Sequence, residues 1–339
     1  MSNDTTVHST SPLLDVSDLT VEFATSTGAV QAVRNVSIHV AHGETVALVG
    51  ESGSGKSVTA QAIMGLLPKR ISQVSSGSVS FLEQDLLKLP PRQLRDLCGN
   101  DLAMIFQDPM SSLNPVMRIG YQLTESMWRK GGASRKQARI RAIELMDIVG
   151  IPDARNRVDD YPHQFSGGMR QRIMIAMALT REPRLLIADE PTTALDVTVQ
   201  AQIMELLKGL QSELGMALLL ISHDLGVVAD SADRVYIMYG GSIVESGITR
   251  STYENPAHPY TTGLLASIPS VYERGTRLTP IPGSPPLPTA SRTGCSFAER
   301  CPFAVDQCRT DEPLLRNPVG WPSTRETACH RTEEVLQHG

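Results

Sequence analysis

One short run of the sequence has the composition of a phosphate-binding loop. Residues 50–57 read GESGSGKS and match the pattern G-x-x-x-x-G-K-[ST] at every fixed position. Glycines let backbone N–H groups turn toward phosphate oxygens, and the N-terminus of a following helix adds the positive end of its dipole. In such a loop Lys56 reaches the β- and γ-phosphates, and Ser57 holds Mg²⁺.

Two acidic residues follow an apolar segment later in the chain. Residues 185–188 read LLIA and lead directly into Asp189 and Glu190. Asp189 can hold Mg²⁺ directly or through water, and Glu190 points in a different direction and can polarise an attacking water molecule. Acidic strand ends are common on protein surfaces, so this pair is informative only because a phosphate loop precedes it.

His223 follows a second apolar segment, residues 217–222. A single histidine is more often structural than functional. Here it lies at the end of a predicted strand of the same sheet, where the γ-phosphate of a bound nucleotide is expected. Together with the two motifs above, His223 favours a nucleoside triphosphatase site.

These residues need a parallel α/β sheet to bring them together. A strand at 44–49, the loop and a helix at 58–67 form the expected strand–loop–helix order. The other elements that the pattern predicts are short strands within 13–43 broken at 26–28, helices within 118–149 including 134–149, buried parallel strands at 185–188 and 217–222, later strands at 234–238 and 242–245, and a proline-rich linker at 280–288.

Composition narrows the class of protein. The 339 residues carry a net charge of −5, whereas a free nucleic-acid binder is more often basic. No apolar run is long enough to span a bilayer, and the polar N-terminus lacks the features of a secretory signal. We therefore expect a cytosolic chain whose membrane role, if it has one, comes through partner subunits.

Several further segments resemble motifs of one family, the ABC ATPases. Residues 165–172, FSGGMRQR, resemble its signature sequence, although Met169 stands where many members have Gln. Gln107 resembles the Q-loop glutamine, residues 194–196 resemble the D-loop, and His223 resembles the switch histidine. Phe23 is a candidate for stacking on adenine, with a place in the core as its alternative. The resemblance covers roughly 13–259.

The resemblance implies a fold and a set of site residues. The fold is an α/β P-loop NTPase nucleotide-binding domain at 12–262, with a RecA-like parallel sheet core, an antiparallel β subdomain and a helical subdomain at about 113–165. The site residues are Glu190, His223 and Gln107 for catalysis; Ser57, Gln107 and Asp189 for Mg²⁺; and Phe23, Gly50, Ser52, Gly53, Ser54, Gly55, Lys56, Ser57, Val58, Ser166, Gly167, Gly168 and Asp196 for ATP. Two such domains are expected to pair head to tail, so that ATP lies between one loop and the other subunit's Ser-Gly-Gly segment.

A narrower resemblance indicates the dipeptide and oligopeptide importer branch. It rests on the runs at 193–203, 255–265 and 294–302. It implies a peripheral subunit on the cytoplasmic face of a bacterial inner membrane, with two permease subunits, a second ATP-binding subunit (related or identical) and an extracytoplasmic peptide-binding protein as partners. Nickel importers share much of this pattern and remain an alternative.

Soluble ABC ATPases of DNA repair or translation are a different class. Repair members usually insert a long coiled coil between the nucleotide motifs, and translation members usually carry two cassettes, and neither feature is visible here. A degenerate regulatory cassette is disfavoured because Lys56, Asp189, Glu190 and His223 are all present.

Four of the five cysteines crowd the C-terminal part, which we assign to an extension at 263–339. Cys295, Cys301, Cys308 and Cys329 have the spacing C-x5-C-x6-C-x20-C, within a predicted metal-binding segment at 295–330. In a reducing cytosol such a set favours a metal over disulfides. Four thiolates suit either a [4Fe–4S] cluster or Zn²⁺. Some peptide-importer ATPases that this chain resembles carry a [4Fe–4S] cluster in this region, and the resemblance favours the cluster.

Overall fold

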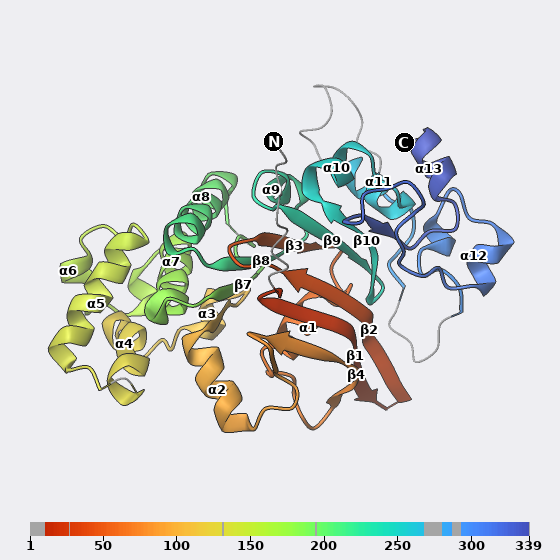
Figure 1. Cartoon of the computed structure of the whole chain (residues 1–339). Coiled ribbons are helices and arrows are strands. Elements are labelled where there is room, and N and C mark those ends of the chain that lie inside the picture. The colour runs from red at the N-terminus through yellow and green to blue at the C-terminus, as the bar shows by residue number, and fades with distance from the viewer. Residues whose placement is uncertain are drawn as a thin grey trace, which may run out of the picture.

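The computed structural model describes residues 11–26, 28–130, 132–193, 195–267, 280–286 and 293–338. Within these residues no helix is both long enough and apolar enough to cross a membrane. Two sheets and a group of helices make up the molecule, and the C-terminal segment packs beside the second sheet (Figure 1).

The first sheet is antiparallel and has the strand order β2-β1-β4-β5. Its strands are β1 Leu14–Thr25, β2 Gly28–Val40, β4 Ser72–Phe81 and β5 Gln84–Asp85. The expected break at 26–28 is confirmed, because β1 ends at Thr25 and β2 begins at Gly28. Alternating apolar side chains of β1 and β2 bury one face of this sheet against α1 (Lys56–Ile63).

The second sheet has the order β11-β10-β9-β3-β8-β7-β6. Its parallel strands are β3 Thr45–Val49, β6 Leu102–Ile105, β7 Leu185–Asp189, β8 Ala217–Ser222 and β9 Arg234–Tyr239. Two strands run antiparallel at one edge, β10 Ser242–Ile248 and β11 Glu326–Thr327. The expected central strands are confirmed: every residue of β3, β7 and β8 is buried, as continuous apolar runs in a parallel sheet require.

The helix after the phosphate loop is shorter than predicted. The pattern indicated residues 58–67, but α1 begins at Lys56 and ends at Ile63. Its early end has a local cause: Gly65 has φ +65°, and the N–H groups of Gly65 and Leu66 donate back to the carbonyls of Ala62 and Gln61, which closes the helix.

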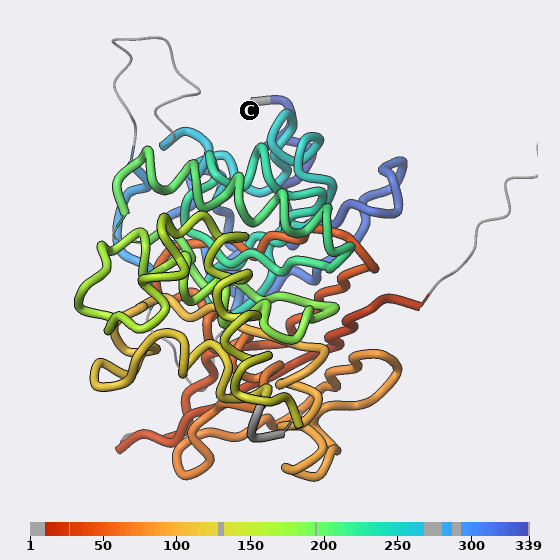
Figure 2. Tube along the Cα trace, turned by 90° about the vertical axis from the view of Figure 1, so that its left-hand side faces the viewer, coloured from red at the N-terminus to blue at the C-terminus, as the bar shows by residue number. Residues whose placement is uncertain are grey.

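Helices form a separate layer at the left of Figure 1, which faces the viewer in Figure 2. The expected helices within 118–149 are confirmed as α4 Ile119–Lys130 and α5 Arg135–Ile148, and Ser134 and Gln137 form a capping box that starts α5. The remaining helices of the described domain are α2 Pro91–Asn100, α3 Pro109–Ser112, α6 Ala154–Arg157, α7 Gly167–Ala178, α8 Val197–Leu214, α9 Leu225–Ala229, α10 Thr249–Glu254 and α11 Pro259–Leu265, with 3-10 turns at Pro162–Gln164 and Leu179–Arg181.

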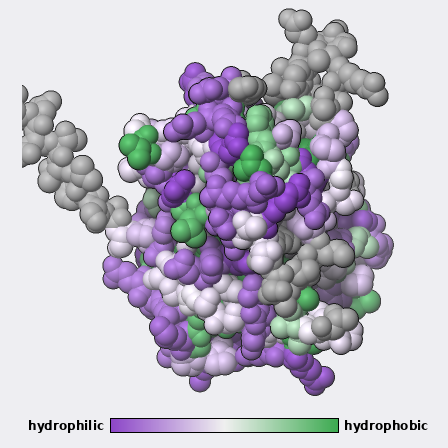
Figure 3. Space-filling model, turned by 90° about the vertical axis from the view of Figure 1, so that its right-hand side faces the viewer, coloured by the Kyte–Doolittle hydropathy of each residue, from purple (hydrophilic) through white to green (hydrophobic). Residues whose placement is uncertain are grey.

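The C-terminal segment adds little regular structure of its own. It contains a 3-10 turn at Ala298–Arg300, α12 Asp306–Thr310, β11 and α13 Thr332–His338. Arg325 of this segment donates to the buried Glu245 of β10 at 3.3 Å, and this contact fixes the segment to the second sheet. Glu245 also accepts from two backbone N–H groups that lie before the segment. The face seen in Figure 3 is mostly hydrophilic, and its apolar side chains are scattered.

The described part of the predicted linker, residues 280–286, forms neither helix nor strand. It is not simply a spacer, because the carbonyls of Ile281 and Pro282 accept hydrogen bonds from Arg300. The last two residues of the predicted linker, 287 and 288, lie outside the described residues.

Candidate active site

The glycine-rich loop joins β3 to α1, as the sequence predicts. At two positions of the loop only glycine fits, because the backbone of a neighbouring strand lies very close. A Cβ on Gly50 would lie 2.1 Å from the carbonyl oxygen of Met238, and a Cβ on Gly55 would lie 2.6 Å from that of Ala32. Gly55 also has φ +110°, a conformation that other residues rarely adopt. The neighbouring β9 and β2 therefore fix the path of this loop.

Lys56 is the first residue of α1, and its side chain is 4% exposed. Its Nζ donates to the carbonyl oxygens of Gly50 at 2.7 Å and Glu51 at 3.0 Å, so the side chain folds back along the loop. Burial lowers the pKa of Lys56, and the nearby carboxylates of Glu190, Asp189 and Glu51 partly oppose that effect. The loop thus holds an ammonium group beside its backbone N–H groups, which is a site for anionic oxygens.

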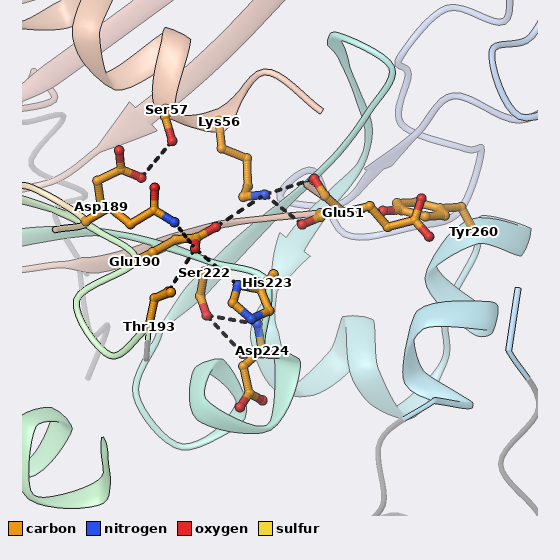
Figure 4. Close-up of polar contacts among 12 residues, drawn as sticks. Glu51, Lys56, Ser57, Asp189, Glu190, Thr193, Ser222, His223, Asp224 and Tyr260 are labelled. Carbon is orange, nitrogen blue, oxygen red and sulfur yellow. Dashed lines mark hydrogen bonds and ion pairs between the residues drawn. The ribbon is translucent and has the colours of Figure 1, made fainter. Parts of the chain in front are cut away.

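Asp189 ends β7 and lies beside the start of α1. Ser57 Oγ donates to Asp189 Oδ1 at 2.9 Å (Figure 4). Burial raises the pKa of Asp189, and the hydrogen bond from Ser57 opposes this. A hydroxyl and a carboxylate at this distance are suitable oxygen ligands for Mg²⁺.

Glu190 is the centre of the polar network in Figure 4. Its Oε2 accepts from Gln107 Nε2 and from Thr193 Oγ1, both at 2.9 Å. His223 Nδ1 lies 3.4 Å from the same oxygen, and Lys56 Nζ lies 4.0 Å from Oε1. The carboxylate is thus oriented by four neighbours, and it can accept a proton from a water molecule held near them.

The backbone explains why adjacent acids point in different directions. Glu190 has φ +47°, which is uncommon for a residue with a side chain. Its N–H donates to the carbonyl of Ile221 on β8, and its own carbonyl accepts from Thr193 N–H. This turn carries Glu190 away from the Mg²⁺-type position of Asp189 toward His223 and Gln107.

The structure brings together six of the residues singled out in the sequence: Lys56, Ser57, Gln107, Asp189, Glu190 and His223. Other candidates lie elsewhere. Ser166 caps α7 in the helical layer, and Asp196 is an exposed cap of α8. Phe23 is partly buried on β1 and packs against the core of the first sheet. Ala194 of the expected D-loop lies outside the described residues.

Sequence reasoning missed Thr193, although it lies three residues after Glu190. It also missed contacts of the loop residue Glu51: its backbone N–H donates to Tyr260 Oη at 2.8 Å, and its carboxylate pairs with Arg300. The Thr193–Glu190 contact is local in the sequence. The two Glu51 contacts join residues 209 and 249 positions apart, for which one sequence offers no signal.

The four C-terminal cysteines line one narrow cavity, together with His258, Phe297 and His330. Burial is the first cause that raises the pKa of Cys295, and it raises the pKa of Cys301 and Cys329 to about 11. Among the residues that the structure describes, no group of three or more Cys, His, Asp or Glu side chains has an arrangement that could hold a metal ion. The metal site therefore stays a prediction.

Comparison with family models gives two matches. Residues 33–193 match a model described as ABC transporter, and residues 244–308 match one described as oligopeptide/dipeptide transporter, C-terminal region. The second match includes Cys295, Cys301 and Cys308.

Relatives resemble this chain over most of its length. A dipeptide transport ATP-binding protein of Bacillus subtilis is 52% identical over 87% of this chain and 88% of its own. An oligopeptide transport ATP-binding protein of the same organism is 51% identical over 89% and 85%. A dipeptide transport ATP-binding protein of Haemophilus influenzae is 49% identical over 94% and 95%.

Solved structures support the same relationship. A dimeric ATP-binding cassette, MJ0796, bound to ADP and Pi is 26% identical, with a TM-score of 0.63, and the match covers 70% of this chain and 99% of that one. The protein cbiO1 of Clostridium perfringens, part of the ABC transporter complex cbiONQ, is 26% identical with a TM-score of 0.62, over 72% of this chain and 92% of its own.

Proposed function

This chain belongs to the ABC transporter family of ATP-binding subunits, and from that premise we propose that it hydrolyses ATP to drive the import of dipeptides or oligopeptides. The observation that carries the proposal is the network around Glu190, which lies beside the phosphate loop. The peptide class is supported by the C-terminal family match and by the relatives named above, and this favours peptide over nickel.

We assign the loop to the triphosphate. Lys56 would bind the β- and γ-phosphates, and Ser57, Asp189 and Gln107 would hold Mg²⁺ directly or through water. The rest of the proposed ATP contacts in this loop are Gly50, Ser52, Gly53, Ser54, Gly55 and Val58. The two close-packed glycines support this assignment, since they keep the loop backbone next to the ligand position.

Glu190 is our candidate general base. Gln107 and Thr193 orient its carboxylate, and His223 lies where it can sense or hold the γ-phosphate. Water attack on the γ-phosphoryl group would then release phosphate, while Mg²⁺ and Lys56 neutralise the charge that develops.

A second ATP-binding subunit completes the proposed site. Ser166 begins α7 in the helical layer, to the left of α1 in Figure 1, so the subunit's own signature segment is not part of its Glu190 network. Ser166, Gly167, Gly168 and Asp196 would act on ATP bound to the partner, and Phe23 would stack on adenine. The MJ0796 cassette is dimeric, which supports pairing with a second subunit, whether that is a related or an identical chain.

The permease subunits would dock at a groove lined by residues of α2, β6, α4 and α7. This apolar groove has a volume of about 640 Å³, and Leu66, Phe106 and Arg181 are in its lining. Leu66 and Phe106 are 48% and 41% exposed, a large exposure for apolar residues in the interior of a groove. A cytoplasmic helix of one permease would fill it, and the second permease would dock on the second ATP-binding subunit. This would place the chain on the cytoplasmic face of the inner membrane, with a peptide-binding protein on the other side.

We assign 12–262 to the nucleotide-binding domain, about 113–165 to its helical subdomain and 263–339 to the extension. Within 295–330 the four thiols would hold a [4Fe–4S] cluster. Four thiols, three partly buried and one buried, line one cavity, and this clustering supports the proposal. The cavity is narrow, at about 10 Å³, and the thiols do not form a ready metal site, so they would have to move to bind either a cluster or Zn²⁺. The resemblance to peptide-importer ATPases that carry a [4Fe–4S] cluster favours the cluster over Zn²⁺.

Glu190→Gln tests the proposed reaction in the assembled transporter. The amide cannot accept a proton, so we expect ATP binding to persist while the hydrolysis rate falls roughly 100-fold or more. Lys56→Ala should instead weaken ATP binding, measured with a fluorescent ATP analogue. Near-normal phosphate release by Glu190→Gln would overturn the assignment of Glu190.

A further inference from the structure

One side chain of the C-terminal extension reaches the phosphate loop. Arg300, in the turn between Cys295 and Cys301, donates from both terminal nitrogens to the carboxylate of Glu51, at 2.7 and 3.1 Å. Glu51 is the second residue of the loop motif. This is a bidentate pair, the strongest geometry for an arginine and a carboxylate.

The guanidinium is held on all sides. Its Nε donates to the carbonyl of Pro282 at 2.8 Å, and its terminal nitrogens also donate to Tyr239 Oη at 3.2 Å and to the carbonyl of Ile281 at 3.4 Å. The Arg300 side chain is only 6% exposed. Because every side of the fork has an acceptor, Arg300 has one well-defined position relative to the loop.

Glu51 is clamped at its backbone as well. Its N–H donates to Tyr260 Oη at 2.8 Å, and its carbonyl accepts from Lys56 Nζ at 3.0 Å (Figure 4). Tyr239 and Tyr260 both pack against Phe297 of the extension, with ring centroids 5.2 and 5.4 Å apart. A shift of Glu51 would therefore move an acceptor of Lys56.

The negative charge of Glu51 lies in the phosphate loop and calls for a neutralising cation there. The loop binds a triphosphate under the proposed function, and an unpaired carboxylate in it would repel the phosphates. The contact with Arg300 both neutralises that charge and fixes the turn that precedes Lys56. We propose that Arg300 is a positioning residue for ATP binding, which it serves through Glu51 without touching the nucleotide.

This inference rests on the proposed function. The KM for ATP tests the role of Arg300, whereas the hydrolysis rate of Glu190→Gln tests the proposed function. Arg300→Ala in the assembled transporter should raise the KM for ATP roughly tenfold and change kcat less than twofold, because an unpaired Glu51 acts mainly on binding. Added salt should shrink the increase, since the Glu51 side chain is 26% exposed and its charge can be screened. Arg300→Lys should recover part of the loss.

Two further variants separate positioning from loss of fold. In a Glu51→Ala background, Arg300→Ala should change the KM less than twofold, since the carboxylate that it neutralises is gone. Arg309→Ala, which removes an exposed arginine of the same extension, should leave the KM unchanged. An Arg300→Ala effect that persists in the Glu51→Ala background, or that is insensitive to salt, would overturn the inference. Near-normal hydrolysis by Glu190→Gln would overturn the proposed role of Glu190, whereas the KM results above would still support the role of Arg300.

Discussion

At the scale of single residues, the position of Glu190 depends on a neighbour that carries no motif. Thr193 Oγ1 and Gln107 Nε2 donate to the same carboxylate oxygen, each at 2.9 Å. Gln107 lies on a segment between the sheet and the helical layer, whereas Thr193 lies in the same turn as Glu190. Thr193 can therefore hold the carboxylate even when Gln107 moves.

Thr193→Val tests this role. Valine has nearly the same shape but cannot donate, and a hydrogen bond to a charged group contributes roughly 1.5–3 kcal/mol. We expect kcat for ATP hydrolysis to fall roughly tenfold, with little change in ATP affinity. Thr193→Ser keeps a hydroxyl and is the matched control. If Thr193→Val hydrolyses ATP like Thr193→Ser, the hydroxyl does not orient Glu190.

The sequence predicts the motif residues of this site but not the residues that position them. Lys56, Asp189 and Glu190 are recognisable because phosphate chemistry demands these types at these spacings. The contribution of Thr193 depends on the positive φ of Glu190, which no propensity argument predicts. Arg300 meets Glu51 only through tertiary packing of the extension.

At the scale of elements, buried strands were easier to predict than the helices around them. β3, β7 and β8 are continuous apolar runs, and their pattern depends only on burial. Helix α1 ends beside Gly65, which has φ +65°. A side chain at this position would collide with Leu94 of α2, and such a contact between elements cannot be read from a local pattern. The strand β4 was not predicted, because its serine-rich sequence carries a weak apolar alternation.

The apolar groove lined by α2, β6, α4 and α7 gives a prediction at this scale. A photo-cross-linking residue in place of Leu66 or Ser126, both of which line the groove, should capture a permease subunit in the assembled transporter. The same residue in place of Arg250 on α10, where the side chain is 87% exposed, is the control and should not. Cross-links confined to the C-terminal extension would contradict this docking site.

At the scale of the whole molecule, ion pairs tie the extension to the nucleotide-binding domain. Among the described residues these are Arg300 with Glu51, Arg325 with the buried Glu245, and Glu312 with Arg34. Between these contacts lies the cavity that the four cysteines share. Clustering of the cysteines was predictable from spacing, but their meeting in one cavity depends on turns that have little regular structure.

Protein purified without oxygen tests the cluster. We expect bound iron and sulfide and a broad absorbance near about 400 nm, as for thiolate-ligated iron–sulfur centres. Cys301→Ser should remove this absorbance, whereas Cys98→Ser, which changes the one cysteine outside the cavity, should keep it. Stoichiometric zinc without iron would refute the cluster and keep the ligands. Finding neither metal, with the extension still folded, would refute both.

The two-residue strand β11 has a consequence for solubility. It pairs with Glu245 and Ser246 of β10, which is otherwise the last strand on that side of the sheet. An uncovered edge offers free N–H and C=O groups to a strand of another molecule. A chain cut before residue 293 would carry such an edge, and its buried Glu245 would lack the Arg325 partner. The extension therefore covers backbone groups that could otherwise pair with a strand of another molecule.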